Sequence, residues 1–114
     1  MKPYTDLNQS KKLAEILPLE SADMYYDVDS YGVQTTPEVL MTSVVRKKDI
    51  PCWSLAALLD NIPQVKLDNI KQYDKKYWRC CAYFASDWHN SDWCDNPVDA
   101  CYEMIIKLHE QNIL

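Results

Sequence analysis

Glycine is almost absent from this sequence, which contains a single one, Gly32. The loops that bind nucleotide phosphates and dinucleotides need several glycines, because only glycine lets the backbone approach the phosphate groups closely. The sequence therefore excludes both motifs, and with them most classes of nucleotide-dependent enzyme.

Long apolar runs are missing as well. From Met1 the chain runs directly into polar residues, and no window approaches the ~18 apolar residues of a membrane span. The five cysteines are an odd number. Without a secretory signal, we expect reduced thiols in a cytoplasmic protein that does not associate with membranes. The length of 114 residues is typical of one domain, so we expect a single domain over residues 1–114.

The net charge of −5 disfavours sequence-independent binding to nucleic acid, which depends on neutralising phosphates. The charges are also unevenly distributed. Residues 66–79 contain five basic side chains against two acidic ones, whereas residues 86–103 contain no lysine or arginine. The candidate acidic patch in the second segment is Asp87, Asp92, Asp95 and Asp99. Two solvated surfaces of opposite charge are the simpler interpretation, and a polarised surface for a protein partner is the functional one.

The N-terminal half of the chain is predicted to contain a helix and a strand, followed by a segment whose structure is ambiguous. Apolar residues at helical spacing predict a helix over residues 6–17, capped by Thr5. Alternating polarity predicts a half-buried strand over residues 23–29, followed by a turn at residues 30–32. Residues 33–48 combine a proline suited to a helix start with a run of β-branched residues. We favour strand or irregular structure there and leave a helix open.

Two helices are predicted from their N-terminal caps. Ser54 is suited to cap a short central helix, with Trp53 directly before it as a hydrophobic staple. Asn96 and Pro97 occupy the cap and first position of a C-terminal helix, which Asn112 is placed to end. The apolar stripe of the C-terminal helix includes Val98, Cys101, Tyr102, Ile105 and Leu108.

Between these helices the sequence predicts a β-hairpin. Residues 64–74 read as a polar connection, residues 75–85 as a strand, and residues 86–94 as its hairpin partner. One face of the strand carries Trp78, Cys80, Ala82 and Phe84, and the other carries Tyr77, Arg79, Cys81 and Tyr83. We expect the C-terminal helix to cover the first face. The predicted fold is a single α+β domain in which antiparallel hairpins pack with an N-terminal, a short central and a C-terminal helix.

Two segments carry a resemblance to known sequences. They are residues 50–59, IPCWSLAALL, and residues 95–110, DNPVDACYEMIIKLHE, and residues 21–24 also fit. They resemble signatures of a group of small uncharacterised proteins encoded by prophages and other mobile elements of Bacteroides-type gut bacteria. The resemblance is confined chiefly to the two helices and leaves residues 27–48 uncovered. It implies a cytoplasmic protein in a mobile-element setting, and it supplies no activity and no catalytic residue.

Thiol or zinc chemistry is one hypothesis for the cysteines and histidines. Zinc prefers four converging thiolate or imidazole ligands, and the sequence has neither a CxxC nor an HxxxH pair. The nearest set is Cys81 or Cys80 with His89 and Cys94, plus a fourth group from elsewhere. Cys94 precedes a capped helix whose dipole favours a thiolate, but its aspartate neighbours raise its pKa. We therefore assign no catalytic residue, metal or cofactor, and we rank a small thiol- or zinc-dependent enzyme third.

Binding functions rank higher. The chain contains eight tyrosines, four tryptophans and one phenylalanine, and Tyr, Trp and Arg dominate binding hot spots. The leading hypothesis is a non-enzymatic protein-interaction module, an adaptor or inhibitor, and a second copy of the chain is left open as its partner. The alternative is single-stranded nucleic-acid binding on an aromatic and basic strand face. Its candidate residues are Tyr77, Arg79, Tyr83, Lys75 and Lys76.

Overall fold

The computed structural model describes residues 2–29, 32–33, 36–39 and 49–114. The helices of this part of the chain are α1 (Leu7–Leu13), the 3-10 helix η1 (Leu19–Ser21), α2 (Leu55–Asp60) and α3 (Pro97–Glu110). The strands are β1 (Met24–Tyr26), β2 (Val28–Asp29), β3 (Gly32–Val33), β4 (Glu38–Val39), β5 (Ile50–Cys52), β6 (Lys66–Gln72), β7 (Lys75–Phe84) and β8 (Asp87–Asn90). All strand pairs formed by these residues are antiparallel. The predicted α+β class is confirmed.

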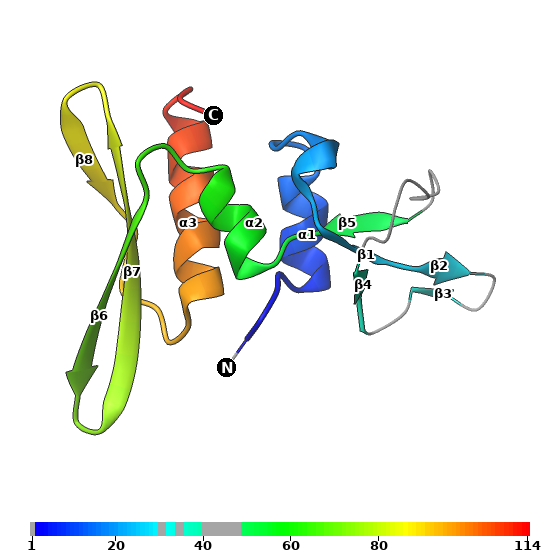
Figure 1. Cartoon of the computed structure of the whole chain (residues 1–114), viewed down its shortest axis with the longest axis horizontal. Coiled ribbons are helices and arrows are strands. Elements are labelled where there is room, and N and C mark those ends of the chain that lie inside the picture. The colour runs from blue at the N-terminus through cyan, green and yellow to red at the C-terminus, as the bar shows by residue number, and fades with distance from the viewer. Residues whose placement is uncertain (1, 30–31, 34–35, 40–48) are drawn as a thin grey trace.

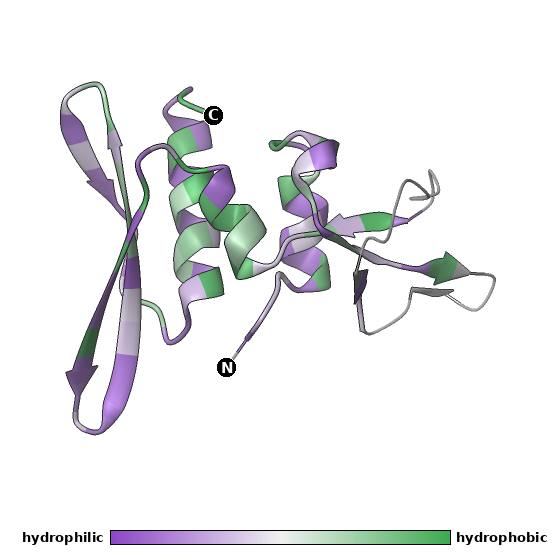
Figure 2. Ribbon diagram, viewed as in Figure 1, coloured by the Kyte–Doolittle hydropathy of each residue, from purple (hydrophilic) through white to green (hydrophobic). Residues whose placement is uncertain are grey.

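The elements are arranged in successive layers (Figure 1). A sheet of order β6-β7-β8 lies beside α3 and α2, and α1 separates these helices from a small sheet of order β4-β1-β5 and from the β2-β3 pair. Hydrophobic residues concentrate on α2 and α3, between the larger sheet and α1 (Figure 2). Leu13, Leu58, Ala82 and Ile105 belong to one buried cluster that joins these layers. The hydrophobic core therefore lies on only one side of the β6-β7-β8 sheet.

The C-terminal helix forms as predicted. The Asn96 side chain accepts a hydrogen bond from the backbone N–H of Asp99 at 2.8 Å, and Pro97 occupies the first turn. Ile105 is fully buried among the side chains of the core. Asn112 follows the last turn with a positive φ of 61°, a conformation that asparagine tolerates better than most residues. At 14 residues α3 is the longest helix, and none in the described part of the chain is long and apolar enough to cross a membrane.

The N-terminal helix is capped one residue later than predicted. The Asp6 carboxylate accepts a hydrogen bond from Gln9 N–H at 2.8 Å, and the Gln9 side chain accepts one from Asp6 N–H at 3.1 Å, which together form a capping box. The expected cap, Thr5, is buried instead, with its hydroxyl 2.8 Å from the Ser10 hydroxyl and accepting a hydrogen bond from Trp53 N–H. Tertiary contacts thus recruit the threonine hydroxyl into the core, and the aspartate caps in its place. The helix is also shorter at its C-terminal end than the predicted range.

The central helix begins as predicted. The Ser54 hydroxyl accepts a hydrogen bond from Ala57 N–H at 3.3 Å. Trp53 and Leu58 are both fully buried in the same cluster, and the indole N–H of Trp53 donates to the Ser21 hydroxyl at 3.0 Å. The cap therefore places a large aromatic ring at the junction of α1, η1 and α2.

The predicted polar connection over residues 64–74 is wrong for most of its length. Residues 66–72 form β6, which pairs with β7 from Lys66 opposite Cys81 to Gln72 opposite Lys75. Most of this strand is exposed on both sides, so it lacks the alternation by which a half-buried strand is recognised. The predicted hairpin over residues 75–94 does form, between β7 and β8. As a result, β7 is a central strand with a partner on each side.

The predicted strand over residues 23–29 is split at Asp27 into β1 and β2, which belong to different sheets. Within residues 33–48, the structure describes Glu38–Val39 as strand β4 paired with β1, which agrees with strand and not with a helix start. Val33 belongs to strand β3, where it pairs with Val28. Residues 34–35 and 40–48 lie outside the described residues. So do two of the three residues of the predicted turn at 30–32.

Candidate functional site

The two faces of the β6-β7-β8 sheet have different surroundings. Both α2 and α3 lie on one side of the sheet (Figure 1), which we call the inner face. Cys80 and Ala82 of β7 point to this side and are fully buried. The alternate residues of β7 point to the opposite side, the outer face, which none of the described elements covers. The outer face is therefore the side of the sheet that is open to another molecule.

Strand register defines the residues of the outer face. Cross-strand partners point to the same side, so β6 and β8 contribute the residues opposite the outward residues of β7. The outer face comprises Lys66, Asp68, Ile70, Gln72, Lys75, Tyr77, Arg79, Cys81, Tyr83, Trp88 and Asn90, with Trp93 stacked on Arg79. Trp88, Ile70 and Trp93 remain 49%, 41% and 39% exposed. Large apolar side chains with this much exposure are gathered on one face, which is typical of a binding surface.

Each exposed ring of the outer face lies beside a cation of the protein itself. The Lys66 ammonium is 5.7 Å from the centre of a Trp88 ring, and the Arg79 guanidinium is 4.7 Å from that of Trp93. The Lys75 ammonium is 5.3 Å from the Tyr77 ring. Such pairs stabilise an exposed site by about 0.5–1 kcal/mol each. They favour arrangements in which each ring and its positive charge lie together.

An ion pair lies at the centre of the outer face. The Arg79 guanidinium donates a hydrogen bond to the Asp68 carboxylate at 3.0 Å, and the Lys66 ammonium lies 3.3 Å from the other carboxylate oxygen. The hydrogen bond from Arg79 is the main reason that the pKa of the Asp68 carboxyl lies below its usual range. Arg79 is therefore held between a carboxylate and an indole ring.

The residues predicted for the strand face are brought together, with one exception. Tyr77, Arg79, Tyr83 and Lys75 lie on the outer face, and the Tyr83 ring lies 5.2 Å from that of Trp88. Lys76, which alternates with these residues along β7, points to the side of the inner face. Its ammonium lies 5.4 Å from the centre of the Trp78 ring. Sequence reasoning missed Lys66, Asp68, Ile70, Trp88 and Trp93 as members of this face. The missed signal was the two-residue turn at residues 73–74 that brings β6 alongside β7. The β7–β8 hairpin was expected, but not the register that places Trp88 beside Tyr83.

Asp87 lies apart from the other three residues of the predicted acidic patch. Asp87 begins β8 opposite Phe84, whereas Cys94, next to Asp95, lies opposite Trp78. Six strand residues separate these positions along β7, or about 20 Å. Asp92 and Asp99 both lie near Cys94, since their charges contribute to raising the pKa of its thiol. Asp99 is in the first turn of α3, where it accepts hydrogen bonds from Lys2 and Gln9 at 2.8 Å. Burial would raise the pKa of Asp99, but these hydrogen bonds outweigh it and lower the pKa.

The predicted thiol and metal candidates do not converge. His89 and Cys94 lie opposite the inner-face residues Ala82 and Trp78, about 13 Å apart along the strand, whereas Cys81 points to the outer face. Burial and the carboxyl of Glu103 raise the pKa of the Cys94 thiol to about 12, which disfavours a thiolate. The described residues contain no group of three or more His, Cys, Asp or Glu that could hold a metal ion.

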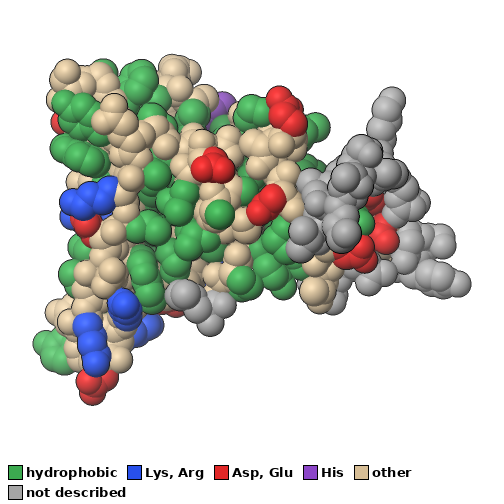
Figure 3. All heavy atoms as spheres, in the orientation of Figure 1, with side chains coloured by type: hydrophobic (Ala, Val, Ile, Leu, Met, Phe, Trp, Pro, Cys, Tyr) green, Lys and Arg blue, Asp and Glu red, His purple; other side chains and the backbone are tan. Residues whose placement is uncertain are grey.

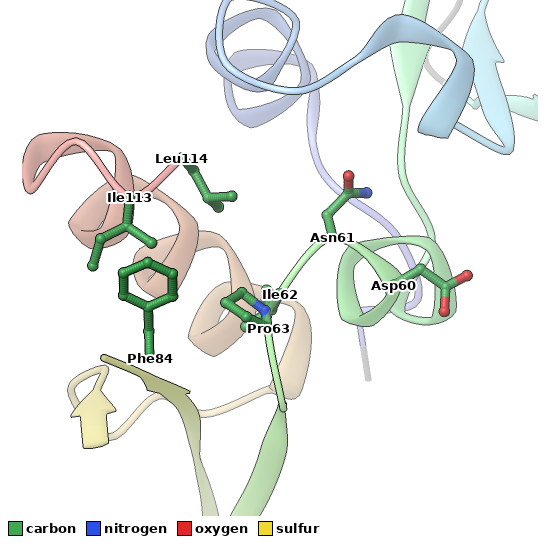
Figure 4. A pocket seen from close by; sticks show the side chains of 7 residues that line it. All are labelled: Asp60, Asn61, Ile62, Pro63, Phe84, Ile113 and Leu114. Atoms are coloured by element: carbon green, nitrogen blue, oxygen red, sulfur yellow. The ribbon is translucent and has the colours of Figure 1, made fainter. Parts of the chain in front are cut away.

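A separate shallow hollow of about 350 Å³ lies away from the outer face. It is bounded by the end of α2, the end of β7 and the C-terminal residues (Figure 4). The Phe84 ring points toward Ile113 across it. Its lining is mostly apolar, with Asp60 as the one ionisable side chain. This lining has no nucleophile or general base paired for catalysis.

Comparison with known proteins adds no homologue to these observations. No protein family, curated protein or solved structure matches the chain. The outer face is therefore interpreted from its own chemistry.

Proposed function

We propose that this protein is a non-enzymatic protein-binding module and that the outer face is its binding surface. The observation that carries the proposal is the exposure of Trp88 and Trp93, 49% and 39%, on a sheet face that no described element covers. Tryptophan, tyrosine and arginine are the residues that contribute most to protein interfaces. An indole held in place by a cation also loses little conformational entropy on binding.

The electrostatics of the outer face favour a protein over single-stranded nucleic acid. A strand of nucleic acid needs free cations for its phosphates and free ring faces for its bases. On the outer face, the Asp68 carboxylate already engages Arg79 and Lys66, and the rings of Trp88 and Trp93 already engage these same cations. The net charge of −5 adds a general repulsion of polyanions.

An adaptor or inhibitor of a mobile element is the form of this function that agrees with the sequence resemblance. Such a protein acts by occupying a surface of another protein and needs no catalytic group. That setting rests on the resemblance of residues 50–59 and 95–110 alone.

The test is affinity capture from the source organism with matched variants. We expect wild-type protein to retain a partner that Trp88→Ala and Trp93→Ala lose. Leu19→Ala serves as the control, because Leu19 is an exposed apolar residue of η1, remote from the sheet. Circular dichroism establishes that all variants are folded. Equal recovery of every bound protein by the outer-face variants would contradict the proposal.

Two further measurements identify the class of partner. Sedimentation of purified protein detects a homodimer, and its conversion to monomer by Trp93→Ala would make a second copy the partner. Fluorescence anisotropy with a labelled oligothymidylate tests nucleic acid. Oligonucleotide binding that is lost in Trp88→Ala and Trp93→Ala would replace the protein-binding proposal by the nucleic-acid alternative.

A further inference from the structure

The hairpin formed by β6 and β7 extends past the helix layer and ends in a prominent aromatic side chain (Figure 1). Tyr73, at its tip, is 94% exposed, the highest value among the exposed large hydrophobic side chains of the described residues. All six residues from 71 to 76, which we call the hairpin tip, are exposed. A tyrosine ring with almost no contacts of its own contributes little to the stability of this fold.

The backbone at the hairpin tip is one that tyrosine disfavours. Tyr73 and Asp74 form a two-residue turn with positive φ values of 52° and 64°, as in the turns that normally carry Asn-Gly. The turn between β7 and β8 has the same form, with Ala85 and Ser86 at 54° and 62°. Backbone strain is therefore common to both turns, whereas the large exposed ring belongs to one of them. The Ala85–Ser86 turn is thus an internal control for the hairpin tip.

The hairpin tip is positively charged on an acidic protein. It contains Lys71, Lys75 and Lys76 against Asp74, a net charge of +2, whereas the whole chain carries −5. Basic side chains gather at this end of the sheet (Figure 3). None of the three lysines forms an ion pair with a carboxylate in the part of the chain that the structure describes. Lys75 and Lys76 lie over the Tyr77 and Trp78 rings, but a ring does not neutralise their charge as Asp68 does for Arg79. The net positive charge of the tip can therefore attract an acidic partner.

We infer that the hairpin tip inserts Tyr73 into a recess on the partner protein whose rim carries aspartate or glutamate side chains. The inference rests on the proposed function and names the chemistry of the partner. The ring supplies apolar contact area and a hydroxyl group, and Lys71 and Lys75 on either side of the turn meet the rim carboxylates. Lys75 belongs to both the hairpin tip and the outer face, and Tyr77 follows it on the outer face, so the two surfaces form one continuous interface.

Site-specific photocrosslinking locates the partner relative to the tip. The photoreactive residue p-benzoylphenylalanine is placed at position 73, at position 88 on the outer face, or at position 19 in η1, in the full-length protein. We expect positions 73 and 88 to label the same protein and position 19 to leave it unlabelled. Mass spectrometry of the peptide crosslinked at position 73 should identify a segment containing aspartate or glutamate.

Affinity measurements with the purified labelled protein then separate binding from folding. Tyr73→Asn removes the ring but provides a residue suited to positive φ, so the melting temperature should rise while Kd increases about thirty-fold or more. Ala85→Asn, the matched control in the other turn, should raise the melting temperature and leave Kd unchanged. The double variant Lys71→Gln with Lys75→Gln should weaken binding and reduce its dependence on salt.

Each remaining outcome rejects a defined part of the inference. Labelling from position 88 without labelling from position 73, or a Kd for Tyr73→Asn within about twofold of wild type, overturns the tip inference and leaves the proposed function standing. A labelled segment without acidic residues overturns the stated chemistry of the recess. Absence of labelling from both positions rejects the tip inference and the proposed function together, as does nucleic acid being the labelled species.

Discussion

The two faces of strand β7 differ in how their residues are used, although they alternate along the same ten residues. On the inner face, the small side chains of Cys80 and Ala82 are fully buried and allow α3 to lie close to the strand. On the outer face, Tyr77 and Arg79 are half-exposed and pair with charged or aromatic neighbours. The inner face stabilises the fold by excluding water, whereas the outer face keeps its large side chains in contact with it. Substitutions on the two faces should therefore affect different properties.

The largest expected loss of stability follows from a substitution in the core next to the inner face. Ile105→Ala should lower the free energy of unfolding by roughly 2–5 kcal/mol, because it leaves a cavity in the core beneath the sheet. Urea denaturation measures this change. The neighbouring substitution Ile106→Ala is the control, since Ile106 is only partly buried and its loss should cost less. Equal costs for the two variants would show that α3 is not seated on the sheet as described.

The next effect concerns the attachment of α3 to the inner face. Asn96→Ala should cost about 1 kcal/mol, because it removes the side chain that accepts the Asp99 N–H. Asp95→Ala provides the comparison, since Asp95 is exposed and does not cap the helix. Thermal unfolding followed by circular dichroism distinguishes the two. A harmless Asn96→Ala would mean that the helix start is held by other contacts.

On the outer face, truncation of a large ring should cost little stability. Trp93→Ala should lower the free energy of unfolding by clearly less than the loss of a buried ring, because Trp93 is 39% exposed and its contact with Arg79 contributes only about 0.5–1 kcal/mol. Trp53→Ala, which removes a fully buried ring of the same type, should cost far more, as expected for truncation in the core. If both substitutions destabilised the protein equally, the outer face would belong to the core and not to a binding surface.

The smallest expected effect is a dependence of fold stability on pH, which comes from the Asp68–Arg79 ion pair of the outer face. The pKa of Asp68 is below its usual value when the protein is folded, so its pairing with Arg79 stabilises the fold above about pH 4. That contribution is lost as the pH falls through the lowered pKa, because protonation removes the negative charge. An NMR titration of the Asp68 carboxyl carbon measures the pKa directly. It should move upward in Arg79→Met, and an unchanged pKa in that variant would exclude the hydrogen bond as its cause.

The elements predicted well are those with local signals. Asn96 and Ser54 each cap a helix through a backbone N–H three residues away, so neighbouring residues suffice to identify the helix start. The alternation of β7 is likewise visible within its own length. The predicted cap of α1 is wrong because Thr5 and Asp6 are both good capping residues. The hydrogen bond from Trp53 N–H engages Thr5 in the core, and Asp6 then caps the helix.

The site was predicted less completely than the fold. Sequence alternation placed Tyr77, Arg79 and Tyr83 on one face, but it contained no information on what lies opposite them. Strand β6 is exposed over most of its length because it projects beyond the core, so its local pattern did not identify it as a strand. Neither Asp68 nor Ile70 was therefore recognised as a member of the outer face. The assumption that Arg79 is free for phosphates fails once Asp68 is placed beside it.

The sequence by itself determined the helix starts at Ser54 and Asn96 and the two-sided pattern of β7, because caps and residue spacing act over a few neighbouring residues. Only the tertiary structure decided that β7 has a partner on each side and that its aromatic face is left uncovered. It also decided that Arg79 is held by Asp68 and Trp93, and that Tyr73 stands at the end of a projecting hairpin. The physical reason is that strand pairing and burial depend on residues distant in the sequence, whose positions no local pattern specifies.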